Sequence, residues 1–191
     1  MRIYSTIYAD PPWMERGGGK IKRGADRHYK LMTTKDIMAL PIISNIAADN
    51  CHLYLWTTNN FLPDALKVMA AWGFTYKTMI TWVKSEYYGE GTFKLQNAGL
   101  GQYYRGLTEH CLFGIKGCLP YKIDPMTLKR QQGKTAFIAP RTHHSEKPPE
   151  MRQMIEKVSY EPRIELFARE RFTGWDVWGN EISSNINFSC P

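Results

Sequence analysis

The chain has 191 residues, of which 43% are hydrophobic, and it carries a formal net charge of +7. This length favours a single domain with its own core. A pI of about 9.2 and 13% aromatic residues suit a polyanion with flat bases, although a merely basic soluble protein has the same composition. The absence of a signal peptide and of a long apolar run predicts an intracellular, cytoplasmic protein with reduced cysteines and no membrane partner.

The first predicted element is a strand over residues 3–8, followed by the turn Pro11-Pro12, because proline cannot donate to a sheet. Asp10 is therefore expected at the carboxyl end of a strand, where open α/β sheets bind ligands. The Asp10 carboxylate and the Pro11 carbonyl can accept hydrogen bonds from an exocyclic amine, and Trp13 can stack on its ring. The structural alternative is an ordinary turn with Trp13 in the core.

Strands and helices alternate along the rest of the chain. A capping-box pattern predicts a helix start at residues 33–36, and Asn59 is expected to cap a helix over 62–72. The other predicted elements are strands at 51–57, 75–83, 135–139 and 163–169, loops at 87–104 and 121–134, and a helix at 149–158. This alternation indicates βαβ units and a parallel sheet.

Four separated sequence blocks resemble one known family. Asp10-Pro11-Pro12-Trp13 resembles the signature of the adenine-N6 branch of the amino-methyltransferases, the MT-A70 family. The other blocks are Gly99-x-Gly101 with residues 109–117, Ser145 to Pro148, and residues 163–169 with 174–181. They occur in the order of the family and cover the chain from Tyr8 to Glu181.

The resemblance implies an α/β fold of the Rossmann-like, S-adenosylmethionine (SAM)-dependent methyltransferase class. Its mostly parallel sheet would have helices on both faces, in a permuted order with the catalytic motif first. Residues 1–182 would form one methyltransferase domain, and residues 183–191 a flexible tail. The implied reaction is methyl transfer from SAM to the N6 amine of adenine in nucleic acid, with DNA favoured because the chain is compact.

The resemblance also implies roles for individual residues. The catalytic set is Asp10, Pro11, Pro12 and Trp13; the SAM-binding set is Asp10, Lys147, Arg169, Asn180 and Glu181; the substrate-binding set is Trp13, Tyr29 and Arg105. Lys147 stands at the mouth of the last helix, where it can reach a carboxylate or another anion. Glu109 is expected to tie down the loop that carries Arg105, and no metal is predicted because no His/Cys spacing completes a zinc site.

Several alternatives stay open at this point. The target can be RNA, since a flipped-out adenine presents the same edge in either polymer. A non-catalytic nucleic-acid-binding scaffold subunit, a cytosine-N4 methyltransferase and a nicotinamide-dependent enzyme are the rival functions, although the sequence lacks G-x-G-x-x-G after its first strand. A homodimer or a related partner subunit is compatible with so small a domain.

Overall fold

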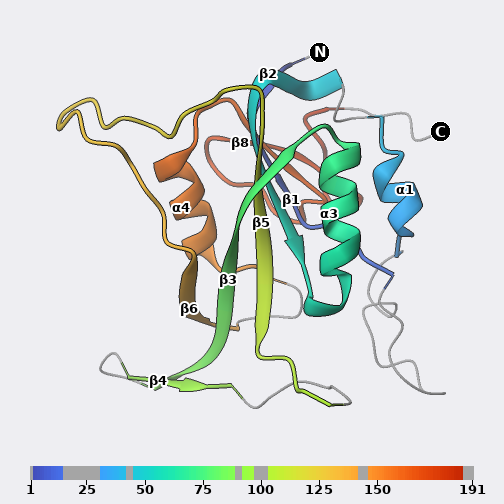
Figure 1. Ribbon diagram of the computed structural model, residues 1–191, viewed down its shortest axis with the longest axis vertical. Helices are drawn as coiled ribbons and strands as arrows, with labels where there is room; N and C mark the ends of the chain where they lie inside the picture. Colours follow the sequence, from blue (N-terminus) through green and yellow to red (C-terminus); the bar gives the residue numbers. More distant parts are fainter. Residues whose placement is uncertain are drawn as a thin grey trace.

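The computed structural model describes residues 2–14, 31–41, 45–88, 92–96, 103–141 and 146–186. Within these residues the chain forms one eight-stranded sheet flanked by helices (Figure 1). The strands are β1 (Tyr4–Ala9), β2 (Ala47–Thr57), β3 (Thr75–Tyr88), β4 (Thr92–Leu95), β5 (Thr108–Lys116), β6 (Ala136–Pro140), β7 (Arg163–Leu166) and β8 (Trp175–Trp178).

Over the described residues the sheet is mixed, with four parallel and three antiparallel strand pairings, and β3/β4 is one of the antiparallel pairs; the predicted parallel character holds for the strands next to β1 and for β3/β6. Its strand order is β4-β3-β5-β2-β1-β7-β8, with β6 paired to β3. The pairs β1/β2, β1/β7, β7/β8 and β3/β6 are parallel, whereas β5 is antiparallel to both of its neighbours, β2 and β3. The carboxyl ends of β1, β7 and β8 therefore meet at one edge of the sheet, and β5 begins at this same edge because it runs the other way.

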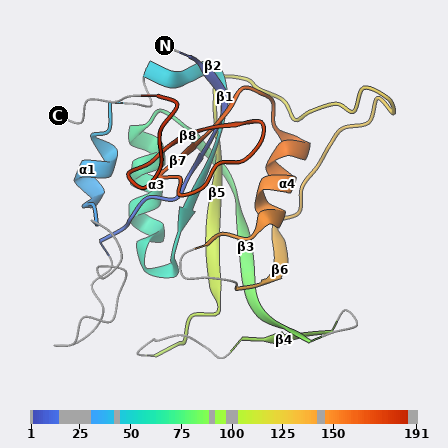
Figure 2. The same ribbon diagram turned by 180° about the vertical axis from the view of Figure 1, so that it is seen from behind.

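Helices cover both faces of the sheet. Figures 1 and 2 show α1 (Thr34–Met38) and α3 (Leu62–Ala71) on one face and α4 (Pro149–Val158) on the other. The predicted capping box forms: the Thr33 side chain accepts from the Asp36 backbone, and the Asp36 side chain accepts from the Thr33 backbone. Within the described residues, the helices are too short to cross a bilayer.

Two hydrophobic clusters hold the layers together. One packs under α1 and α3 and includes Ile7 and Val68; the other packs under α4 and includes Tyr8 and Ile155. Side chains alternate between the faces of a strand, so Tyr8 and Asp10 project to the same side. Asp10 is thereby directed toward the face that α4 covers.

Two predicted details of the fold are wrong. The stretch predicted as a loop at 87–104 contains the end of β3 and the strand β4, which pair as a hairpin through partners such as Glu86 and Lys94. Asn59 does not cap α3: it lies in a 3₁₀ turn, η2 (Asn59–Phe61), and its side chain contacts Thr108 and His110. The polar partners of Asn59 come from β5, which no local pattern reveals.

The start of the predicted tail is held by the fold. The Asn185 amide donates to the Val177 carbonyl at 2.9 Å, and the Val177 amide donates to the Asn185 side chain at 3.0 Å. Ser184 exchanges hydrogen bonds with the backbone of Gly179. Residues 183–186 thus run beside β8, and residues 187–191 lie outside the described residues.

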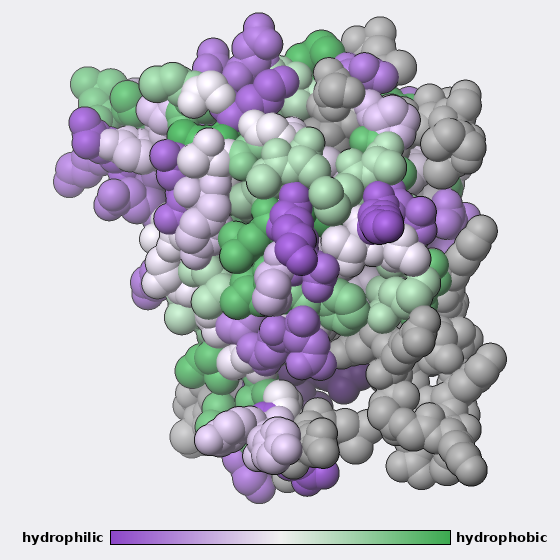
Figure 3. Space-filling model, turned by 45° about the vertical axis from the view of Figure 1, so that its right-hand side comes forward, coloured by the Kyte–Doolittle hydropathy of each residue, from purple (hydrophilic) through white to green (hydrophobic). Residues whose placement is uncertain are grey.

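The molecular surface mixes both kinds of side chain. Figure 3 shows hydrophilic and hydrophobic residues interleaved over one face. The segment between β5 and β6 projects away from the sheet in Figure 1, and its Met126 and Leu128 are exposed. The segment leaves β5 at Lys116, the end farthest from the edge where Asp10 lies, so it belongs to the opposite side of the molecule.

Candidate active site

Asp10 stands immediately after β1, where the Pro-Pro pair stops the strand. Its amide still donates to the carbonyl of Leu166, the last residue of β7, at 3.4 Å. One carboxylate oxygen, Oδ2, lies 2.7 Å from the Nζ atom of Lys147. The Asp10 side chain is 24% exposed and that of Lys147 is 11% exposed, so this ion pair has only a narrow opening to solvent.

The ion pair is one link in a longer series of charges. Lys147 Nζ also lies 3.3 Å from Oε2 of Glu109, and the other Glu109 oxygen, Oε1, lies 2.6 Å from Nζ of Lys84. Negative and positive groups alternate from Asp10 through Lys147 and Glu109 to Lys84. The four formal charges cancel, which reduces the cost of burying each one.

Burial and ion pairing shift the pKa values of Asp10, Glu109 and Lys147 in opposite directions. Burial raises the pKa of Asp10 above its ordinary value, although Lys147 opposes this effect. Burial also works against ionisation of Glu109, but Lys147 and Lys84 together hold the pKa of Glu109 below its ordinary value. For Lys147, burial favours the neutral amine, yet Asp10 and Glu109 raise its pKa and keep it charged.

The Pro-Pro turn is fixed by backbone contacts. The Pro11 carbonyl accepts from the Trp13 amide at 2.8 Å, and the Pro12 carbonyl accepts from the Met32 amide at 2.8 Å. A carbonyl oxygen has two lone pairs, so Pro11 can accept a second hydrogen bond. Trp13 is 6% exposed; its ring stacks on Phe61 and donates from Nε1 to the Trp56 carbonyl at 3.0 Å. In this structure, then, the indole packs in the core.

His110, next to Glu109, is held by polar neighbours. Its Nδ1 lies 3.0 Å from Thr81 Oγ1, and its Nε2 lies 2.8 Å from Asn59 Oδ1. Burial lowers the pKa of His110, which favours the neutral imidazole. Glu109 itself contacts Lys84 and Lys147, so the expectation that it secures the Arg105 loop is replaced by a role inside the site. No group of metal-ligating side chains occurs among the residues described.

The expected SAM-binding residues follow the neighbouring strands β7 and β8. Arg169 is exposed and follows β7, and its charge opposes the effect of burial on the pKa of Asp10. Asn180 and Glu181 are exposed and follow β8. The ends of β7 and β8 are joined where the Ala168 amide donates to the Trp178 carbonyl at 2.9 Å. Adjacent strand ends thus supply a carboxylate, a guanidinium and an amide.

The two predicted substrate residues are less closely tied to this site. Arg105 is exposed and precedes β5, the strand that carries Glu109. Since β5 begins at the edge where β1 ends, Arg105 belongs to the same side of the sheet as Asp10. Tyr29 lies outside the described residues.

Gly179 allows the last two strands to end close together. A Cβ atom built on Gly179 would lie 2.1 Å from the Ala168 carbonyl oxygen, a contact that requires the backbone to move. We expect Gly179→Ala to destabilise the fold by about 3 kcal/mol and to weaken SAM binding. The added methyl group would clash with the Ala168 backbone, which cannot move aside as a flexible side chain can.

The measurement is the thermal unfolding midpoint with and without SAM. Gly106→Ala is the matched control, because a Cβ at Gly106 meets nothing within 4 Å. An unchanged midpoint for Gly179→Ala would contradict this account of the turn.

No sequence pattern predicts two features of the site, the position of Lys84 and the pairing of Arg152 with Glu165. Lys84 joins the site only because β3 pairs with β5 in the register that opposes Trp82 to Glu109. Arg152 on α4 forms two hydrogen bonds of 2.9 Å to Glu165 on β7, which fixes the helix to the strand that precedes Arg169. Both pairings depend on tertiary contacts between segments far apart in the chain.

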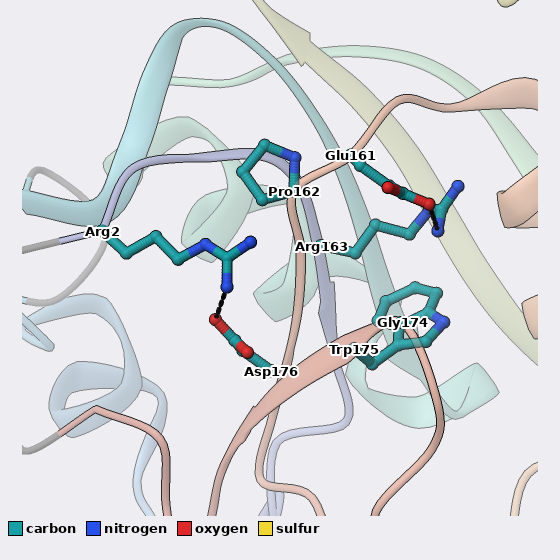
Figure 4. Close-up of a pocket in the computed structure, with 7 residues that line it drawn as sticks. All are labelled: Arg2, Glu161, Pro162, Arg163, Gly174, Trp175 and Asp176. Atoms are coloured by element: carbon teal, nitrogen blue, oxygen red, sulfur yellow. Dashed lines mark hydrogen bonds and ion pairs between the residues drawn. The ribbon is translucent and has the colours of Figure 1, made fainter.

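A small cavity lies at the other end of the sheet. Its volume is about 190 Å³, and Figure 4 shows its lining. Arg2 is paired there with Asp176, and Arg163 with Glu161. Arg163 begins β7, whereas Asp10 is level with the end of that strand, so this cavity is separate from the candidate active site.

Comparison with known proteins gives this arrangement a family. The MT-A70 family model matches residues 4–181. The chain belongs to the MT-A70 family. The matched range begins with the first residue of β1 and ends with Glu181, so it contains the whole sheet and the site just described.

Named methyltransferase relatives match nearly the whole chain. The type II methyltransferase M.MunI of Mycoplasma sp is 31% identical over 95% of this chain and 79% of its own length. The N(6)-adenine-specific methyltransferase METTL4 of Homo sapiens is 29% identical over 95% of this chain, and the N(6)-adenosine-methyltransferase non-catalytic subunit METTL14 of Xenopus tropicalis is 27% identical over 97%. This chain spans 38% and 41% of those two proteins.

These findings confirm the predicted family and the Rossmann-like methyltransferase fold. They also confirm the predicted class of enzyme, an adenine-N6 methyltransferase of the MT-A70 type.

Proposed function

We propose that this MT-A70 protein transfers the methyl group of SAM to the N6 amine of an adenine in DNA. The observation that carries the proposal is the Asp10 carboxylate, held at the end of β1 beside a charged Lys147 and followed by a stiff turn. DNA is favoured over RNA because the bacterial type II methyltransferase M.MunI is 31% identical and is covered over 79% of its own length.

The residues after β1, β7 and β8 suit SAM. Asp10 can accept from its ammonium group, Arg169 can meet its carboxylate or ribose, and Asn180 and Glu181 can bind ribose hydroxyls. Lys147 offers a further cation for the carboxylate of SAM. Bound there, SAM would supply an electrophilic methyl group on a sulfonium sulfur. We assign residues 1–186 to the methyltransferase domain, since residues 183–186 are bonded to β8.

The chain's own residues position the amine. Asp10 accepts one hydrogen bond from the N6 amine and the Pro11 carbonyl accepts another, which directs the nitrogen lone pair toward the methyl group. Lys147, 2.7 Å from Asp10, opposes the rise that burial causes in the pKa of Asp10 and so favours the ionised carboxylate as the acceptor. The amine loses its proton after methyl transfer, so no strong base is needed, and much of the rate increase comes from positioning.

In this proposal Trp13 has two roles: it fixes the Pro-Pro turn, and it lines the path along which the methyl group is transferred. Its amide holds the Pro11 carbonyl, and its indole is anchored to Trp56. Arg105 and Tyr29 are proposed to contact the nucleic acid near the flipped base. A second copy or a related subunit is the proposed source of any further nucleic-acid surface.

The test is transfer of labelled methyl from SAM to single-stranded DNA, duplex DNA and RNA, with identification of the product nucleoside. N6-methyladenine in DNA supports the proposal, and N6-methyladenosine in RNA alone replaces DNA by RNA as the target. N4-methylcytosine overturns the choice of base. SAM binding without transfer to any polymer would favour a non-catalytic subunit, the role that the name of METTL14 gives to that relative.

A further inference from the structure

Lys84 is a lysine that the proposed reaction does not use, yet it is built into the site. It lies on β3, and its Nζ contacts Glu109 Oε1 at 2.6 Å and stands 5.3 Å from the centre of the Trp82 ring. Its side chain is 18% exposed, and its backbone amide donates to the Leu107 carbonyl. Contacts of this kind hold a long side chain in one place, which a solvated surface lysine does not require.

Glu109 is shared between two lysines. Oε1 faces Lys84, and Oε2 faces Lys147 at 3.3 Å, while Lys147 lies closer to Asp10, at 2.7 Å. Lys147 is thus pulled by two carboxylates and rests nearer to Asp10. Since Lys84 neutralises Glu109 from the far side, it weakens the competing attraction of Glu109 for Lys147.

We propose that Lys84 is a positioning residue of the active site: by neutralising Glu109, it keeps Lys147 in contact with Asp10. The inference rests on the proposed function, in which an ionised Asp10 accepts from the N6 amine. Without Lys84, the unneutralised Glu109 draws Lys147 away from Asp10. Asp10, which is mostly buried, then loses its counter-charge and takes up a proton more readily.

A substitution of Lys84 leaves the chemical identity of the other charged or titratable groups that act on Asp10 unchanged. They are Glu109 and Cys111 on β5, Glu165 on β7, Arg169 after β7 and Lys147 before α4. None of these groups is altered by a substitution on β3. A change in the behaviour of Asp10 in a Lys84 variant therefore reports on the link through Glu109.

The experiment compares Lys84→Met with Lys84→Arg, which keeps the charge, and with Lys77→Met, an exposed lysine on the same strand. We expect Lys84→Met to lower kcat about tenfold with KM for DNA within about twofold, within the range for coupled groups. Lys84→Arg recovers most of kcat, and Lys77→Met matches the wild-type protein. In a Glu109→Gln background, Lys84→Met has less than about a twofold further effect, since the charge that Lys84 neutralises is gone.

A second readout does not need turnover. The carboxyl carbon of Asp10, assigned with Asp10→Asn, is titrated by NMR in the wild-type protein and in Lys84→Met. We expect the Asp10 titration to move to higher pH in Lys84→Met. Thermal unfolding confirms that each variant is folded.

Three kinetic results would overturn the inference. They are a wild-type kcat in Lys84→Met, an undiminished effect of Lys84→Met in the Glu109→Gln background, and a change in KM alone, which would make Lys84 a nucleic-acid contact. If the wild-type protein transfers no methyl group, the proposed function fails and the NMR titration still decides the role of Lys84. If the wild-type protein is active and Asp10 titrates alike in both proteins, only this inference fails.

Discussion

Replacing Asp10 by Ala is expected to lower methyl transfer at saturating substrate by on the order of a hundredfold or more. Asp10 is the carboxylate at the end of β1, and the structure surrounds it with Lys147 and the end of β7. Ala removes the acceptor for the N6 amine and leaves Lys147 with Glu109 alone. Asp10→Asn should show a similar loss, because its amide keeps the shape of the side chain but not its charge.

The measurement is kcat for labelled methyl transfer, with SAM binding followed separately by calorimetry. Asp64→Asn on α3 is the matched control, since this carboxylate lies in the first turn of a helix on the other face of the sheet. A kcat within a factor of about two of the wild-type value in Asp10→Ala would remove Asp10 from the mechanism.

Replacing Lys147 by Met is expected to shift the acidic limb of the pH–rate profile to higher pH and to lower activity at pH 7 by about tenfold to a hundredfold. The direction of this shift follows from the two opposing effects on the pKa of Asp10. Burial raises the pKa of Asp10, and Lys147 is the group that opposes this most strongly. In the wild-type protein, activity is lost as the pH falls through the pKa of Asp10; without Lys147 that loss begins at a higher pH.

Partial recovery of the Lys147→Met variant at alkaline pH is the distinguishing result. A lysine that only binds the SAM carboxylate would raise KM for SAM and leave the acidic limb in place. The matched control is Lys157→Met, which removes an exposed lysine from the last turn of α4. Thermal unfolding shows whether the variant remains folded, since breaking a buried ion pair is itself destabilising.

The sequence predicts most of this fold because its signals are local. Periodic apolar residues predict α4 with the bounds that it has, and the capping box predicts the start of α1. The proline pair correctly places Asp10 at a strand end. The prediction of a loop is wrong around β4, a short strand that forms only because the end of β3 is available to pair with it.

The same distinction between local and tertiary signals applies to the candidate site. The sequence block that ends at Pro148 predicts Lys147 as a site residue, and in the structure Lys147 lies 2.7 Å from Asp10. The links from Lys147 to Glu109 and from Glu109 to Lys84 depend on the register between β3 and β5, which no single segment encodes. Trp13 shows the converse: its residue type suits stacking on a base, but its position in the core depends on Phe61 and Trp56.

The reversed direction of β5 has a consequence for how such a protein can be diversified. The strands β1, β7 and β8 reach the edge where Asp10 lies with their last residues, whereas β5 contributes Glu109 with its second residue. Residues 103–107, which lead into β5, therefore lie toward the edge where Asp10 stands, while the segment after Lys116 leaves from the opposite end. Residues inserted before β5 would therefore lie on the same side of the sheet as Asp10, and residues inserted after β5 would lie at the opposite end, away from Asp10.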